Sequence, residues 1–163
     1  MNNFHIGDRI RNKMKEDGRI EKWLADKIHC APSKITRICQ TKSIDTNILA
    51  DICIHLEYNF FEDYVKYVNN QLQLDHISVE YFFINDQIHI GKFIRRIKKE
   101  KGIKANWLAE KVAYSEENLQ KIYKHENMDI ERLIKFCIHL KFNFFNLYTS
   151  YVDEQIKKKK QGI

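Results

Sequence analysis

A polar stripe in the first quarter of the chain carries side chains that are suited to recognising another molecule. Ser33, Thr36, Arg37 and Gln40 recur at i, i+3, i+4 and i+7, and Lys34 lies beside them. On a helix this spacing places the four side chains on one face. Hydroxyl, guanidinium, amide and ammonium groups are those that contact phosphates and base edges in the major groove of DNA. The pattern therefore predicts a helix that can read duplex DNA.

The residues around this stripe predict how it is positioned. The opposite face of the segment is apolar, with Ile35, Ile38 and Cys39. Pro32 suits the first position of a helix, because its missing N–H would have no partner there anyway. The connection over residues 27–32 is very short, so the preceding helix must cross this one steeply. Such a pair of helices is a helix-turn-helix arrangement.

The chain contains an internal repeat. Residues 5–68 align with residues 89–152 at a constant offset of 84 without a gap. Among the matching stretches are His5-Ile6-Gly7 with His89-Ile90-Gly91, Trp23-Leu24-Ala25 with Trp107-Leu108-Ala109, and Asn59-Phe60-Phe61 with Asn143-Phe144-Phe145. We interpret the chain as a duplication of one unit with five helical segments. Gly18 and Gly102 are expected to end the first helix in a left-handed conformation, and Asp45 and Asp129 to cap the fourth.

These patterns predict an all-α fold, with two tandem helix-turn-helix domains of about five helices each and an apolar linker. The expected boundaries are residues 1–70 and 89–152 for the domains, 71–88 for the linker and 153–163 for a basic tail. The apolar stretch 77–84 fits a short strand or a packed helix, and its period does not decide between them. The lysine run 157–160 fits a frayed, solubilising end or a sequence-blind phosphate contact.

Two stretches of the first repeat resemble a known family. Trp23-Leu24-Ala25-Asp26-Lys27-Ile28, followed after the stripe by Ser43-Ile44-Asp45-Thr46, is similar to the lambda-repressor-like (XRE/Cro-type) helix-turn-helix domains, and closest to small bacterial regulators typical of Bacteroides-like organisms. The resemblance implies a transcriptional regulator that binds specific double-stranded DNA sequences. It implies base contacts at Ser33, Lys34 and Arg37, and phosphate contacts at Lys22, Gln40 and Lys42. One departure is His29-Cys30, where the family's turn usually has a small residue.

The second repeat departs further from this pattern, with Ser115-Glu116-Glu117-Asn118 at the start of its third helix. Glu117 could accept a hydrogen bond from a cytosine amino group, or the acidic pair could complement the positive end of the helix behind a serine cap. The outward residues available for DNA are Asn118, Gln120, Lys121 and Lys124. The second repeat is therefore expected to have another base preference or to bind mainly the DNA backbone.

Composition and the remaining residues favour binding over catalysis. The net charge of +6 suits an anionic partner, and residues 89–152 hold 13 Lys and Arg against 7 Asp and Glu. We expect no catalytic residues, no metal site, no cofactor and no membrane span, and a cytoplasmic location with reduced cysteines. Trp23 and Trp107 are interpreted as core residues, and His55 and His139 as ordinary helix histidines. The sequence does not identify an inducer.

Two partners and two functions fit these observations. The expected partner is double-stranded DNA, with a second copy of the chain in a homodimer as a further option. The alternative to DNA binding is a helix-turn-helix scaffold for protein–protein interaction, in which the second repeat has lost base readout. Glu116 and Glu117 are the residues that favour this alternative.

Overall fold

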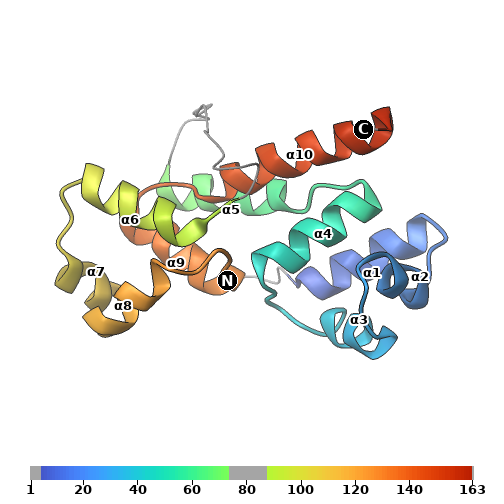
Figure 1. Cartoon of the computed structure of the whole chain (residues 1–163), viewed down its shortest axis with the longest axis horizontal. Helices are drawn as coiled ribbons and strands as arrows, with labels where there is room; N and C mark the ends of the chain where they lie inside the picture. The colour runs from blue at the N-terminus through green and yellow to red at the C-terminus, as the bar shows by residue number, and fades with distance from the viewer. Residues whose placement is uncertain (1–4, 74–87, 163) are drawn as a thin grey trace. The chain divides into compact units, whose positions relative to one another are not determined.

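A computed structural model describes residues 5–73 and 88–162 of the chain. In this part the regular elements are ten helices and no strand, which confirms the predicted all-α class (Figure 1). The helices are α1 (Ile6–Glu16), α2 (Glu21–Lys27), α3 (Pro32–Ile38), α4 (Thr46–Leu56), α5 (Phe61–Leu72), α6 (Ile90–Glu100), α7 (Ala105–Lys111), α8 (Glu116–Ile122), α9 (Ile130–Leu140) and α10 (Phe145–Gln161). Within the described ranges, none of them has both the length and the apolar composition for crossing a bilayer.

The helix bounds follow the offset found in the sequence. Helices α6 to α9 begin and end 84 residues after α1 to α4, and α10 begins 84 residues after α5. Gly18 and Gly102 have φ values of +63° and +64°, so both glycines adopt the left-handed conformation expected after the first helix of each repeat. Asp129 caps α9 through its side chain, whereas Asp45 occupies the cap position of α4 without a side-chain hydrogen bond.

The chain divides into two compact units that do not follow the repeats. Unit 1 comprises residues 1–60 and 152–163, and unit 2 comprises residues 61–151. Helix α5 of the first repeat therefore belongs to unit 2, and the last turns of α10 belong to unit 1. The sequence placed these boundaries differently because it reveals the repeat but not the surface on which each last helix packs. Most of the expected linker, residues 74–87, lies outside the described residues.

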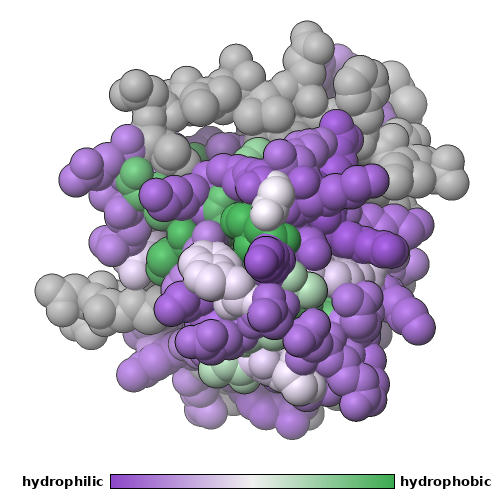
Figure 2. All heavy atoms as spheres, turned by 90° about the vertical axis from the view of Figure 1, so that its left-hand side faces the viewer, coloured by the Kyte–Doolittle hydropathy of each residue, from purple (hydrophilic) through white to green (hydrophobic). Residues whose placement is uncertain are grey.

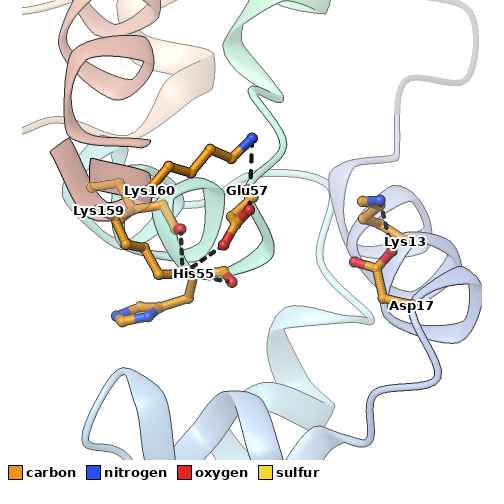
Figure 3. A network of polar contacts seen from close by, with 7 residues as sticks. Lys13, Asp17, His55, Glu57, Lys159 and Lys160 are labelled. Carbon is orange, nitrogen blue, oxygen red and sulfur yellow. Dashed lines mark hydrogen bonds and ion pairs between the residues drawn. The ribbon is translucent and has the colours of Figure 1, made fainter. Parts of the chain in front are cut away.

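The end of α10 packs within unit 1 instead of fraying (Figure 3). The Lys159 ammonium donates to the carbonyl oxygens of Ile54 at 3.2 Å and His55 at 3.4 Å, and it pairs with the Glu57 carboxylate at 3.3 Å. Lys160 reaches the other carboxylate oxygen of Glu57 at 3.7 Å. These carbonyls lie in the last turn of α4, where a helix has unpaired acceptors and a negative dipole end. The lysine run is therefore part of a helix and not a frayed end, which was one of its two interpretations.

The apolar cores consist of the faces that the periodicity predicts. Fully or almost fully buried residues of unit 1 include Ile6, Ile10, Leu24, Ile35, Leu49, Ile52 and Phe60. Those of unit 2 include Ile90, Ile94, Leu108, Leu119, Leu133, Phe136 and Phe144. Helix α5 packs against α9 in unit 2, where Phe61 and Tyr64 meet the aromatic residues at the start of α10. This mutual covering of short amphipathic helices stabilises each unit through the burial of apolar area.

The two tryptophans differ from the expected core positions. Trp107 is 41% exposed, and the Lys111 ammonium and the His139 ring lie beside its indole. Trp23 is half-buried, with the Arg19 guanidinium 4.4 Å from its ring centroid. The reason is the shortness of the second helix in each repeat. The leucine and alanine that follow each tryptophan are the buried residues of this helix. The indole therefore lies at the edge of the core.

Candidate nucleic-acid interface

The α2–α3 connection in unit 1 is a tight turn built around one left-handed residue. Helix α2 ends at Lys27, His29 has a φ of +53°, and α3 begins at Pro32 as the sequence predicts. The Cys30 N–H donates to the Ala25 carbonyl at 2.9 Å, which closes the turn. Histidine is among the residues that tolerate this conformation without a glycine. The turn therefore keeps its shape although it lacks the usual small residue.

Unit 2 builds the same turn from different residues. Ala113 takes the left-handed position with a φ of +61°, and the Tyr114 N–H donates to the Ala109 carbonyl at 2.8 Å. The Ser115 hydroxyl then caps α8 by accepting from the Asn118 N–H at 3.1 Å. A serine cap replaces the proline start of α3, so two sequences with little local identity produce the same helix pair.

A glycine in the first helix of each repeat allows that helix to contact the backbone at the end of the third helix. A methyl group added to Gly7 would lie 2.6 Å from the carbonyl carbon of Cys39, so α1 touches the backbone at the end of α3 directly. The Gly7 N–H also donates to the Thr41 carbonyl at 3.1 Å. Gly91 repeats both features, with its N–H bonded to the His125 carbonyl at 3.0 Å. The repeated His-Ile-Gly stretch is the sequence signal for this contact, although the sequence alone does not indicate what the glycine touches.

The outer face of α3 is open in the structure. Ser33, Thr36, Arg37 and Gln40 are exposed and Lys34 is half-buried. The Thr36 hydroxyl donates to the Glu21 carboxylate of α2 and lies 3.3 Å from the Pro32 carbonyl. This hydrogen bond ties α2 to α3 on the outer surface. Lys22 on α2 and Lys42 after α3 are exposed as well.

The outer face of α8 is open too, but its polar groups differ. Asn118, Gln120, Lys121 and Lys124 are exposed. The Lys121 ammonium pairs with the Glu117 carboxylate at 2.9 Å, with both side chains more than half exposed, so solvent screens this pair strongly. Ala105 stands in α7 where α2 has Glu21, so Gln120 lacks the carboxylate that holds its counterpart Thr36.

Basic residues on α6 add to the positive charge of unit 2. Arg95, Arg96 and Lys99 are exposed, and Arg96 pairs with Glu100 at 2.7 Å. Burial raises the pKa of the Tyr123 phenol to about 12, and the Arg95 charge opposes this rise. No group of three or more metal-binding side chains is arranged around a common point within residues 5–73 and 88–162. The exposed side chains of this surface carry hydrogen-bonding and charged groups.

Comparison with known families found a similarity for the second of these helix pairs. Residues 94–149 match the family model of the Cro/C1-type helix-turn-helix DNA-binding domain. The matched range begins within α6, includes α7, α8 and α9, and ends within α10. The search of curated proteins and the search of solved structures gave no significant match.

The matched range lies in the second repeat, whose third helix departs further from the expected family pattern than that of the first repeat. Its match agrees with the expected resemblance to XRE/Cro-type domains and supports DNA binding. The first repeat has the same helix bounds at the 84-residue offset and the same left-handed turn position. The two helix pairs are therefore comparable position by position, and they differ in their turn residues and in their outward side chains.

Proposed function

We propose that the chain is a transcriptional regulator that binds specific double-stranded DNA sequences, with α3 and α8 as its recognition helices in the major groove. The observation that carries this proposal is the exposed polar outer face of the helix that follows the tight turn in each unit. The Cro/C1-type match over α8 supports the same role. The width of the major groove admits one such helix with its outward side chains against the base edges.

The side chains of the two helices suit different contacts. In the first repeat, Arg37 can donate two hydrogen bonds to a guanine, and Ser33 and Lys34 lie one turn nearer to the helix start. In the second repeat, Gln120 can make a paired contact with an adenine, and Lys121 and Lys124 suit phosphates. Because the two outward faces are unlike, the expected binding site is asymmetric and not a palindrome.

Selection of bound duplexes from a random pool, followed by titration of the selected duplex at several salt concentrations, tests this proposal. Matched variants are Arg37→Ala on α3 and Lys135→Ala on α9, which each remove one exposed positive charge. If Arg37 reads a base, R37A costs about 1–3 kcal/mol at one position of the site and relaxes the preference there. K135A is expected to leave the preference unchanged. Failure to bind any duplex with a salt-dependent affinity would overturn the proposal.

A protein-interaction scaffold is the second candidate function, and two exposed apolar residues favour it. Trp107 and Ile138 are 41% and 36% exposed, and Glu116 and Glu117 are exposed at the start of α8. The face seen in Figure 2 is mainly hydrophilic, with a small group of apolar side chains near its centre. A Trp107→Ser variant that keeps full DNA affinity but loses a protein partner would favour the scaffold.

A further inference from the structure

Aromatic residues at the start of the two last helices contact one another reciprocally. Phe61 of α5 stacks on Tyr148 of α10, with ring centroids 4.9 Å apart and an interplanar angle of 20°. Tyr64 of α5 stacks on Phe145 of α10, at 5.1 Å and 21°. Phe145 and Tyr148 occupy the positions of Phe61 and Tyr64 in the second repeat. In both stacking contacts, the phenylalanine position of one repeat therefore contacts the tyrosine position of the other repeat.

The equivalent phenylalanines also meet each other. The ring centroids of Phe61 and Phe145 lie 6.4 Å apart, at an interplanar angle of 31°. Such a contact between equivalent positions is expected only near the centre of a self-complementary surface. The three ring contacts lie inside unit 2.

Two asparagines repeat the same reciprocity with hydrogen bonds. The Asn143 amide donates to the side-chain oxygen of Asn69 at 2.8 Å and to the Val65 carbonyl at 3.0 Å. The Asn59 amide donates to the Asp153 carboxylate at 2.8 Å. Asn59 is equivalent to Asn143, and Asn69 to Asp153. The first pair lies in unit 2 and the second in unit 1, so each unit joins an asparagine of one repeat to the last helix of the other.

Reciprocal contacts of this kind define the interface of a two-fold symmetric dimer, in which residue i contacts residue j and residue j contacts residue i. We infer that the last helices are pairing elements that the two repeats satisfy within one chain, so that a single chain is the counterpart of a homodimer. This inference also implies that one chain supplies both recognition helices to a binding site, and that part of it rests on the proposed function.

Burial leaves no part of this aromatic cluster for a second copy of the chain. Phe61 and Phe145 are completely buried, and Tyr64 and Tyr148 are each 3% exposed. The asparagines are also buried, with 9% of Asn59 and 4% of Asn143 exposed. A second chain could use the same surface only by displacing the repeat that already covers it. The chain is therefore expected to remain a monomer, in contrast to the homodimer that the sequence left as an option.

Sedimentation and native mass spectrometry of the full chain test this inference. We expect a species of 19.7 kDa from low to high micromolar concentration, and one chain on each selected duplex. A dimer that forms with rising concentration, or two chains on each duplex, would overturn the inference while leaving DNA binding intact. A monomer that binds no duplex would overturn the proposed function but not the intrachain pairing.

A cross-linking experiment tests the pairing itself. Asn69→Cys and Asn143→Cys are introduced together into a chain that carries Cys30→Ser, because Cys30 is the least buried native cysteine. A mild oxidant should join the two cysteines in a disulfide within one chain and produce a faster gel band of single-chain mass. The matched control carries Asn70→Cys in place of Asn69→Cys, because Asn70 is the neighbouring exposed residue. This control should cross-link several-fold less. A band of two-chain mass as the main product would contradict intrachain pairing.

Discussion

Gly7 lies so close to the end of α3 that a methyl group on its Cα would be 2.5 Å from the carbonyl oxygen of Ile38. No side chain fits at that distance, so α1 supports α3 through backbone contact. Gly91 has the same relationship to the carbonyl oxygen of Ile122. In both repeats the position of the third helix therefore depends on a glycine that lies outside the second and third helices.

Gly7→Ala should destabilise the chain and weaken DNA binding together. The added methyl group forces α1 away from α3, and overpacking of this kind costs about 1–3 kcal/mol. Urea unfolding followed by circular dichroism measures the loss, and titration with the selected duplex measures the affinity. Asn12→Ala is the control, because Asn12 is exposed on the same helix. Equal stability of G7A and the parent chain would show that the close contact is not needed.

The two stacked aromatic pairs should have similar coupling energies. Double-mutant cycles with alanine at Phe61 and Tyr148, and at Tyr64 and Phe145, should each give about 0.5–1.5 kcal/mol beyond the loss of buried area. The Phe61–Phe145 pair is the internal control, since its centroids are farther apart at 6.4 Å and its coupling should be weaker. Couplings near zero in both stacked pairs would contradict a specific pairing surface.

Lys159→Ala should destabilise unit 1, whereas Lys157→Ala should not. Lys159 neutralises the end of α4 by donating to two carbonyl oxygens, and a cation at a helix C-terminus contributes about 0.3–1 kcal/mol. Lys157 is exposed in the same lysine run and serves as the charge-matched control. Thermal unfolding at low and high salt separates the two variants. A loss that is the same for both would indicate a general charge effect.

Local features were predictable from the sequence because they depend on neighbouring residues. Pro32 begins α3, Ser115 and Asp129 act as caps, and Gly18 and Gly102 end their helices, all for reasons that lie within one or two turns of chain. The exposed outer faces of α3 and α8 follow from helical periodicity in the same way. The composition of the candidate interface was therefore available before the structure, although its contacts with DNA remain a prediction.

The partners of the last helices were not predictable, because both repeats present nearly the same residues. Phe61 stacks on Tyr148 of the second repeat, and the sequence offers the equivalent Tyr64 of a second copy of the chain as an equally suitable partner. Periodicity says which face of a helix is buried but not against what. The position of Trp107 was missed for a related reason, since its burial depends on how far the short α7 extends over the core.

Acidification should destabilise the fold through His55 and His139. Partial burial lowers the pKa of His55 below 6.5, and the nearby Lys159 lowers it further while Asp51 opposes the shift. Burial, together with Lys111, also lowers the pKa of His139. The folded chain therefore binds fewer protons at these sites than the unfolded chain, so the free energy of unfolding falls as the pH drops below the ordinary histidine range.

Urea unfolding at about neutral pH and at about pH 5 measures this effect, and the double variant His55→Gln with His139→Gln should have a smaller difference between the two conditions. His125→Gln is the control, because His125 is exposed in the loop after α8. Carboxylates alone would produce their loss of stability at lower pH, in the range where Asp and Glu titrate. A pH dependence that is unchanged in the double variant would therefore assign the effect to other groups and contradict the role of these two histidines.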